Sequence, residues 1–440
     1  MRIDPNIYKK ALLIVSMVLL SYPMIELVTP LKFAGGVSHS ELTSTFEELN
    51  AENIFNGSFQ ESFSKYVNDR IGLFAFFIKT HNQLEYSLFD KVHAGRTVVG
   101  KNNFLFEKQY IDSYFGEDYV GSEKIEKLGR QMEKLQDSLE ARGKIVVYVL
   151  ATGKATFYPE YIPYEQEKDT TNNERMVQEF IERDINHIHF APYMLELKEE
   201  YGELMFPKYG VHWSYFANIF VADSLTRYIE HKTNWDLPNI EITEMKYSKR
   251  AEYFDNDIAN AMNLFEDIHP DSMAYPEFEW KKPENFDKRK VLFISDSFGW
   301  DLFENLEFGT ECFSEMQFWF YYQAAHDKTV KQGRVNNALP LLARHKDLHQ
   351  FLEDYDAFVI LVNEPNNIYR GWGFPVDALR TIKDSNHVRV ERGNEYLIEQ
   401  FHSKKQWRKA LEKLAEERGV TFEEMIEIYL HDPNFKLESE

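Results

Sequence analysis

The sequence predicts an α/β protein built on a doubly wound, mainly parallel sheet with helices on both faces. Three apolar runs point to this fold class: Ile145–Leu150, Val291–Ile294 and Asp356–Val362. Continuous apolar runs of this length are typical of strands that are buried on both faces. The first run directly follows an amphipathic helical pattern, and a helix that leads into such a strand indicates a parallel sheet.

Composition sets the limits on size and partners. The chain has 440 residues, of which 43% are hydrophobic, enough for one large domain with appendages. The net charge of −22 leaves no basic field to displace phosphate counterions, so we expect no nucleic-acid partner. Cys312 is the single cysteine, which excludes a disulfide framework and a cysteine-rich metal site. Neither a metal nor another cofactor is predicted.

The N-terminus has the pattern of an export signal. Arg2, Lys9 and Lys10 precede a mostly apolar stretch, Ala11–Ile25. A basic flank before an apolar stretch is typical of a signal peptide or a signal anchor. We expect residues 1–36 to form an uncleaved anchor and linker in the cytoplasmic membrane, with the rest of the chain periplasmic or otherwise extracytoplasmic. A cleaved signal peptide and a buried amphipathic helix are the alternatives.

The main domain is expected over residues 37–400, and it begins with a helical lead-in over residues 57–142. Apolar residues recur every three or four positions there, which predicts amphipathic helices. The elements expected in this part are a helix pair over 58–89, strand pieces at 97–100 and 103–106, and a helix over 122–142 that Ser122 can cap and Gly143 ends.

The rest of the domain continues the alternation of helix and strand. Helices are expected over 172–182, 192–201 and 215–229, with a short strand at 187–190. Residues 232–289 are irregular and are interpreted as an insertion that forms a loop or small strands. Residues 401–440 form a separate tail in which the pattern predicts a helical hairpin, and Thr421 and Glu424 have the spacing of a capping box.

A serine turn follows the strand Val291–Ile294. The stretch Ser295-Asp296-Ser297 leads into a helix near Phe298, and a serine at such a turn can lie beside helix-start N–H groups that stabilise an oxyanion. Taken alone, Ser295 is more often an N-cap and Asp296 a first-turn acid. Ligands of open α/β sheets bind beyond the carboxyl ends of the strands, and we expect Leu150, Ser297 and Asn363 to converge there.

A second stretch, Tyr209–Tyr215, supplies a partner for this serine. It contains His212 and Trp213 and is followed at once by a helical run. A serine nucleophile needs a neighbouring general base, and histidine is the usual one. Either stretch alone has a structural interpretation. Together, in this order, they predict a Ser297–His212 pair.

At these stretches the chain resembles the AlgJ, AlgX and DHHW-related proteins, which are SGNH-hydrolase-like acyltransferases. The family pattern is Asp-x-His-Trp followed downstream by a Gly-Asp-Ser-Phe-like turn; here it corresponds to Gly210–Trp213 and Ser295–Phe298. Val99–Phe106 is similar to the family's G-x-d-G-W-L-F strand. Ala151–Glu160 is similar to its P-x-K-x-x-x-Y-P-E loop. The resemblance spans residues 57–385.

The resemblance implies that Ser297 is the nucleophile, that His212 is its base, and that Trp213 walls the site and fixes the imidazole. The chain departs from the pattern at Gly210, where the family has the aspartate that orients the histidine. That acid normally holds the tautomer and stabilises the imidazolium. A Ser–His dyad and an impaired site are alternatives to replacement by another acid. The candidate replacements are Glu364, the one we select, and Asp255 and Asp257.

A second departure is Ser295 in place of the family's glycine, which matters little if the turn does not require a positive φ. Asn363 is a candidate oxyanion donor by analogy with the SGNH asparagine, and Asp296 is grouped with it as support. Four further residues are candidates for substrate binding: Lys154, Tyr321, Tyr322 and Trp300. For all of these the alternative is structural: a turn residue, a loop lysine, or core aromatics.

The predicted function is O-acetylation of a cell-surface or secreted polysaccharide through an acetyl-serine intermediate. The resemblance implies a membrane-bound O-acyltransferase as the source of the acetyl group. One alternative is a carbohydrate esterase with the same Ser–His pair, because transfer and hydrolysis differ only in the acceptor. The other is a polysaccharide-binding or assembly protein whose catalytic site has decayed, which the glycine at position 210 suggests.

Overall fold

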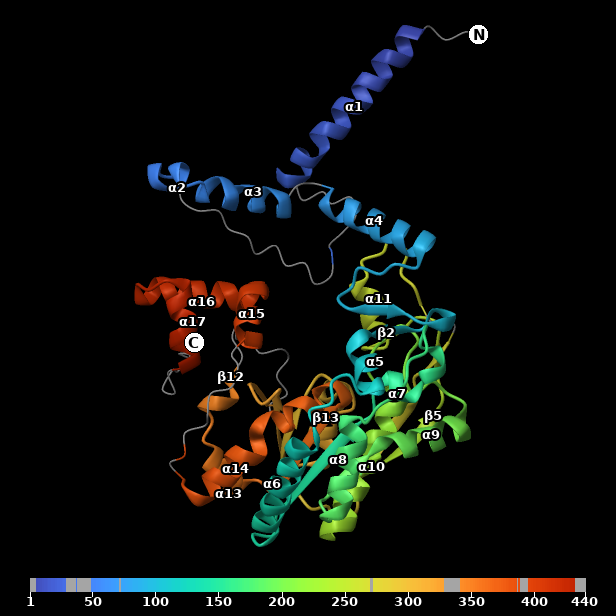
Figure 1. The fold of residues 1–440 in the computed structure, drawn as a ribbon, viewed down its shortest axis with the longest axis vertical. Coiled ribbons are helices and arrows are strands. Elements are labelled where there is room, and N and C mark those ends of the chain that lie inside the picture. Colours follow the sequence, from blue (N-terminus) through green and yellow to red (C-terminus); the bar gives the residue numbers. More distant parts are fainter. Residues whose placement is uncertain are drawn as a thin grey trace. The chain divides into compact units, whose positions relative to one another are not determined.

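The structure is a computed structural model that describes residues 5–28, 37, 49–70, 73–269, 272–327, 341–385, 387 and 395–431 (Figure 1). The chain divides into two compact units. The first comprises residues 1–94, 260–267 and 400–408, and the second comprises 95–259, 268–399 and 409–440. Each unit is described by itself. The domain boundaries expected from the sequence stay predictions.

The first unit is helical. Its helices are α1 (Pro5–Val28), α2 (Ala51–Phe55), α3 (Ser58–Arg70) and α4 (Phe74–Phe89), and the last two confirm the helix pair expected over 58–89. The Asn82 side chain donates a hydrogen bond to the Met262 carbonyl (2.8 Å), which holds the 260–267 segment against α4. None of the helices described here is long and apolar enough to cross a bilayer, so the anchor is not confirmed. Its expected linker, residues 29–36, lies outside the described residues.

A seven-stranded sheet organises the second unit, in the order β12-β11-β10-β9-β13-β3-β4. Strands β10, β9, β13, β3 and β4 are parallel to one another. Strand β11 pairs antiparallel with β10, and β12 pairs antiparallel with β11. The strands are β3 (Ile145–Ala151), β4 (His187–His189), β9 (Lys290–Ser295), β10 (Glu315–Phe320), β11 (Ala324–Asp327), β12 (Leu341–Leu342) and β13 (Ala357–Asn363).

The α/β class is therefore confirmed, but the sheet is mixed. The direction reverses after β10, where Tyr321 and Tyr322 adopt positive φ angles of 50° and 59°. Consecutive positive φ values are typical of tight hairpin turns. They return β11 alongside β10.

Helices precede and follow the parallel strands. They are α5 (Lys108–Phe115), α6 (Ser122–Glu140), α7 (Lys154–Phe157), α8 (Asn172–Glu182), α9 (Phe190–Tyr201), α10 (Tyr215–Thr233), α12 (Phe308–Cys312), α13 (Leu348–Asp354) and α14 (Phe374–Lys383). Gly143 has a φ of 71° just beyond α6, as its predicted role as a stop requires. Ser122 is the first helical residue and not the cap; Gly121 occupies the cap position.

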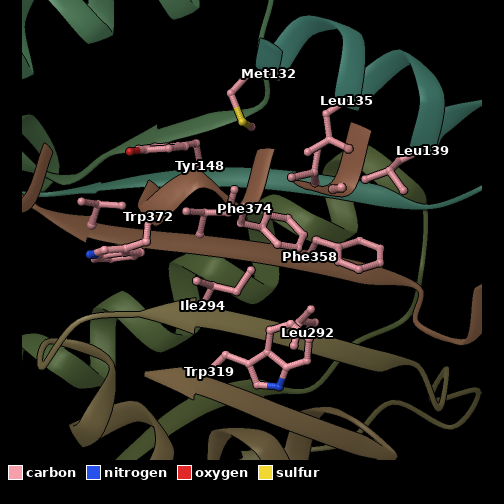
Figure 2. Packing of buried hydrophobic residues seen from close by; sticks show 14 of the residues in the cluster. Met132, Leu135, Leu139, Tyr148, Leu292, Ile294, Trp319, Phe358, Trp372 and Phe374 are labelled. Atoms are coloured by element: carbon pink, nitrogen blue, oxygen red, sulfur yellow. The ribbon is translucent and has the colours of Figure 1, made fainter. Parts of the chain in front are cut away.

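One face of the sheet packs against α6, α8 and α14 in a continuous core. Figure 2 shows Met132, Leu135 and Leu139 of α6 above the strands, with Tyr148 and Phe358 facing them. Alternate residues of β3, β9 and β13 contribute to this cluster, as the two-residue period of a strand requires. The intervening residues, such as Val147 and Phe293, are also fully buried, so these strands are covered on both faces.

The insertion over 232–289 contains small strands, which is one of the two forms expected for it. It contains two small antiparallel sheets, β5 (Asn239–Glu244) with β8 (Glu277–Lys281) and β6 (Tyr247–Ser248) with β7 (Met273–Ala274). Helix α11 (Asp257–Ala261) lies between β6 and β7 in the chain. Outside the insertion, β1 (Thr97–Val99) pairs with β2 (Leu105–Glu107), near the expected strand pieces. The tail contains α15 (Glu395–Ser403), α16 (Lys405–Arg418) and α17 (Phe422–His431), and the Thr421–Glu424 capping box is present.

The central strands place their carboxyl ends together. In the sheet β13 lies between β9 and β3, with Asn363 beside Ala151 and Leu361 beside Ser295. Three turns therefore meet at one edge of the sheet: the turn after Ala151, the Asp296–Ser297 turn, and η5 (Glu364–Tyr369), which follows Asn363. The predicted convergence of these loops is confirmed.

Candidate active site

The turn that carries Ser297 is fixed by the buried carboxylate of Asp296. One oxygen accepts a hydrogen bond from the Phe298 N–H (3.1 Å), and the other accepts from the Asn363 N–H (2.8 Å) and the Asn366 amide (3.0 Å). Burial raises the pKa of Asp296, and these three donors oppose that rise. Asp296 thus ties the end of β9 to the end of β13 and leaves the half-buried Ser297 at the tip of the turn.

Ser295 fits this turn without backbone strain. It is the last residue of β9, its φ is not positive, and its side chain is fully buried. A Cβ placed on Gly299 would lie 2.8 Å from the Ser295 side chain, so the glycine after the turn provides the room that the serine needs. The departure from the family's glycine at position 295 is therefore accommodated locally.

His212 is held by a carboxylate, as a general base requires. Its Nδ1 lies 2.6 Å from Oδ2 of Asp257, while the Val211 N–H donates to Oδ1 of the same carboxylate (2.9 Å). Because a carboxylate oxygen accepts, this geometry assigns the proton of the neutral ring to Nδ1. Nε2 is then the basic nitrogen. It is buried and has no hydrogen-bond partner among the described residues.

The charges around His212 favour its protonated form. Burial acts to lower the pKa of this histidine, but the charge and hydrogen bond of Asp257, helped by Asp301 and Glu107, raise it to about 8. The side chain is 14% exposed. A buried histidine stabilised as imidazolium can accept a proton during a reaction and hold it until a leaving group takes it.

Phe298 joins the serine turn to the histidine loop. Its ring lies edge-on to His212 and to Trp213, with centroids 5.1 Å apart in both cases. Trp213 is fully buried and also packs on Phe190, in keeping with its expected role as a wall. Ser297 and His212 share no hydrogen bond in the structure. Catalytic hydrogen bonds often tighten only when substrate binds.

Glu364, the replacement acid selected from the sequence, does not face His212. Its carboxylate accepts hydrogen bonds from the Thr156 hydroxyl (2.6 Å) and the Asn173 amide (3.3 Å). Burial raises the pKa of Glu364 to about 7. The carboxylate that contacts His212 is that of Asp257, which lies in the insertion.

The space beside Gly210 is filled by other residues, so a side chain at position 210 has no room. A Cβ on Gly210 would lie 2.7 Å from Cγ of Pro207 and 3.1 Å from the Asp255 carbonyl group. The backbone of the segment that brings in Asp257 therefore occupies the space in which a side chain at position 210 would stand. The acid is supplied from a different place in the chain.

Lys154 is structural and does not face a substrate. It is fully buried, and its ammonium group lies within 2.6–2.9 Å of four backbone carbonyl oxygens, those of Leu105, Pro207, Lys208 and Gly210. Burial lowers its pKa well below the ordinary value. The side chain fastens the loop before His212 to β2. The sequence suggested either a substrate contact or an exposed loop lysine. Both interpretations are wrong, because the ammonium group is buried among backbone carbonyls that no sequence motif indicates.

The remaining candidates have structural contacts. The Asn363 side-chain oxygen caps η5 through the Asn366 N–H (3.2 Å), and its amide donates to the Tyr110 hydroxyl (3.1 Å). Trp300 packs edge-on against Phe318. Tyr321 and Tyr322 form the β10–β11 turn and pack near Trp372 and Phe374. An oxyanion role for Asn363 and sugar contacts for the three aromatics stay predictions.

Solved structures similar to this chain include two acetylation proteins. The O-acetyltransferase domain of Pseudomonas putida AlgJ is 15% identical, and the match covers 66% of this chain and 99% of that one with a TM-score of 0.43. Pseudomonas aeruginosa AlgX is 12% identical, and the match covers 66% of this chain and 68% of that one with a TM-score of 0.43. Bacillus cereus PatB1 with a sulfonyl adduct is 11% identical, and the match covers 62% of this chain and 95% of that one with a TM-score of 0.39.

No curated protein matches the chain. A family model does: residues 97–293 match the SGNH hydrolase-like domain of the acetyltransferase AlgX. The match includes His212 and Asp257 and ends within β9, four residues before Ser297. The AlgJ/AlgX-like resemblance expected from the sequence is thereby confirmed: over residues 97–293 the chain is similar to the SGNH hydrolase-like domain of the acetyltransferase AlgX.

Proposed function

We propose that this protein is a serine O-acetyltransferase that acts on hydroxyl groups of a polysaccharide. One observation carries the proposal: the His212–Asp257 pair has a free, buried Nε2 and adjoins the turn that presents Ser297. This supplies a base and an orienting acid although position 210 is glycine. Of the three alternatives for that departure, replacement by another acid fits the geometry best.

In the first half-reaction His212 Nε2 removes the proton of the Ser297 hydroxyl, and Oγ attacks the acetyl carbonyl of the donor. The C–O or C–S bond of the donor then breaks, and the leaving group takes the proton from Nε2. In the second half-reaction a sugar hydroxyl gives its proton to Nε2 and attacks the acetyl-serine, which releases Ser297. Asp257 holds Nδ1–H throughout and stabilises the imidazolium.

The donor and the place of action follow from the same proposal. An acetyl group made in the cytoplasm has to reach an exported enzyme through the membrane, and a membrane-bound O-acyltransferase is the proposed source. The polysaccharide is the proposed acceptor. We place the protein on the extracytoplasmic side, held by its N-terminal segment, as the basic and apolar pattern of residues 1–36 indicates.

The test is intact-mass spectrometry of the protein after incubation with an activated acetyl ester. The wild type is expected to gain one acetyl group, and Ser297→Ala and His212→Ala are expected to gain none. Ser138→Ala is the matched control, because the Ser138 hydroxyl lies on α6 and donates to the Lys134 carbonyl. Full acetylation of Ser297→Ala would sink the mechanism.

A second arm separates transfer from hydrolysis, which leave the same enzyme intermediate. An oligosaccharide is added, and its acetylation is compared with the release of free acetate. Acetylated sugar supports the transferase. Acetate alone, at every sugar concentration, supports a carbohydrate esterase with the same Ser–His–Asp group. Glycan binding that is unchanged in Ser297→Ala, with no adduct in the wild type, supports the decayed binding protein.

A further inference from the structure

We infer that a tyrosine-walled cavity in the insertion binds the sugar acceptor, and that it selects a glycan without acidic groups. This inference rests on the proposed function and names the acceptor class for the same site. The cavity has a volume of about 680 Å³ and lies between β5–β8, β6 and the start of α10. Ligand clefts typically measure about 300–1,000 Å³.

Aromatic rings form much of the wall. Tyr215 and Tyr253 stack with centroids 4.4 Å apart and planes 10° apart, and Tyr275 lies 5.9 Å from Tyr215. Tyr253 is 51% exposed and Tyr247 is 58% exposed, and both line the cavity. An aromatic ring with one apolar face and a hydroxyl suits the C–H face and hydroxyls of a pyranose.

The backbone at Tyr253 supports a functional assignment. Its φ is 52°, a value that L-residues other than asparagine, aspartate and histidine seldom adopt. Strain of this kind persists where the surroundings impose it, commonly at binding sites. Here the stack on Tyr215 holds the ring in place although half of the residue is exposed.

The cavity is connected to the catalytic group by one short segment. Tyr253 lines the cavity, the Phe254 ring lies 5.9 Å from the His212 ring, and Asp257 holds Nδ1 of His212. Between them, Asp255 accepts a hydrogen bond from the Tyr215 N–H (3.2 Å), which fixes the cavity wall to the same segment. A sugar on Tyr253 therefore lies next to the wall of the catalytic site.

The charges of the lining discriminate among sugars. Three carboxylates, those of Glu252, Glu277 and Glu279, line the cavity with one ammonium group, that of Lys246. Lys246 already pairs with Glu277, and Glu279 pairs with Lys281 (2.6 Å). A uronate would add a further carboxylate to this negative field, whereas hydroxyl, acetamido or amino groups can donate to the carboxylates. The cavity thus suits neutral or amino sugars and opposes acidic ones.

The test measures binding by calorimetry with the full-length Ser297→Ala protein, so that it does not depend on acetylation. The probes are pentamers of N-acetylglucosamine, glucosamine, glucose and a uronic acid. We expect the first three to bind and the uronate pentamer to bind at least about tenfold more weakly. Failure of all four to bind at millimolar concentration, or tighter binding of the uronate, overturns the inference.

Variants locate the binding. Tyr253→Ala is expected to weaken binding about tenfold, and Tyr253→Phe, which keeps the ring, should retain it. Tyr164→Ala is the control, since Tyr164 is 40% exposed and does not line the cavity. If Tyr253→Ala does not fold, Tyr247→Ala replaces it. Equal binding by the alanine variant at position 253 and by the control contradicts the assignment.

An enzymatic readout separates this inference from the proposed function. In a background with Ser297 intact, Tyr253→Ala should show a raised KM for the sugar. Loss of acetylation in the wild type itself refutes the proposed function and leaves the binding result standing. A normal KM in Tyr253→Ala refutes the cavity alone.

Discussion

The acid of the candidate active site comes from a place that the family pattern does not indicate. At position 210 a side chain has no room, because the Asp255 backbone and Pro207 occupy its space. The same segment delivers Asp257 to both the His212 ring and the Val211 N–H. Two contacts from one carboxylate fix the ring and its backbone together. The glycine at position 210 and the aspartate at position 257 therefore depend on each other: the glycine leaves room for the segment that brings Asp257 to His212.

The Asp257→Asn substitution tests the role of the Asp257 carboxylate. The substitution keeps the shape but removes the charge and the acceptor for Nδ1–H, and acyl transfer is expected to fall by about 10³–10⁴. The pKa of His212 should also drop below about 8, because burial then acts without the opposing carboxylate. Transfer needs the neutral base, so the rising limb of the pH–rate profile should move to lower pH. Both quantities come from steady-state rates between pH 5 and 10.

Gly210→Asp in the Asp257→Asn background is the matched control. If position 210 could supply the acid, this double variant would regain activity. We expect no recovery and a lower melting temperature, because the new side chain meets Pro207 and the Asp255 carbonyl. Recovery, or an Asp257→Asn profile identical to that of the wild type, contradicts the role given to Asp257.

At the residue level the sequence predicted the placement of Ser297, His212 and Trp213, because each lies in a local pattern of neighbouring residues. It selected Glu364 from the three candidate acids, whereas the carboxylate at His212 is that of Asp257, because the choice depends on how a 45-residue separation closes in space. The assignment of Lys154 was wrong for the same reason: its acceptors are main-chain carbonyls, which every residue possesses and no motif reports.

The turns that follow β3, β9 and β13 are held together by buried polar groups. Asp296 connects the ends of β9 and β13, and Glu364 connects η5 to α7 and to α8 through Thr156 and Asn173. Glu364 is 3% exposed. Such hydrogen-bonded carboxyl groups set the geometry of the loops, and their ionisation destabilises the folded protein because the charge is buried.

Glu364→Gln should stabilise the protein at high pH. The folded-state pKa of Glu364, about 7, is above the ordinary 4.5, so its contribution is fully present below pH 4.5 and is lost as the pH rises through 7. Glutamine stays neutral, and a reoriented Asn173, whose Oδ1 has no partner among the described residues, can accept from it. We expect equal stability near pH 4.5 and a gain of up to about 3 kcal/mol at pH 8.5.

Urea unfolding at the two pH values provides the measurement, with acyl transfer measured on the same samples. Transfer should be retained, because Glu364 does not contact His212. A gain that is the same at both pH values would show that ionisation of Glu364 is not involved. Loss of transfer comparable to that of Asp257→Asn would restore Glu364 as the catalytic acid.

The elements themselves were largely predictable. The strands β3, β9 and β13 and helices α6, α8 and α10 were expected close to their observed bounds, since each has a long apolar or periodic pattern. The β10–β12 part was not expected. Strands β11 and β12 are short, and their register depends on the turn at Tyr321 and Tyr322, where two tyrosines adopt a conformation that glycine or asparagine usually takes.

For the whole molecule, export follows from the pattern of residues 1–36 and stays a prediction. Fusion of alkaline phosphatase to the C-terminus of the full chain tests it, because that reporter needs disulfides that form outside the cytoplasm. We expect an active fusion, with reduced activity after Lys9→Glu and Lys10→Glu, which invert the basic flank. An inactive fusion, produced at normal levels and found in the cytoplasm, contradicts export.

The position of Asp257 affects how relatives of this protein are recognised. A search that requires an aspartate two residues before the histidine would class this chain as inactive, although its histidine has a carboxylate partner. The insertion, which an alignment would treat as a dispensable decoration, supplies that partner. Among related chains, a glycine at the first position and an acid in the insertion should therefore be gained and lost together, as one inherited character.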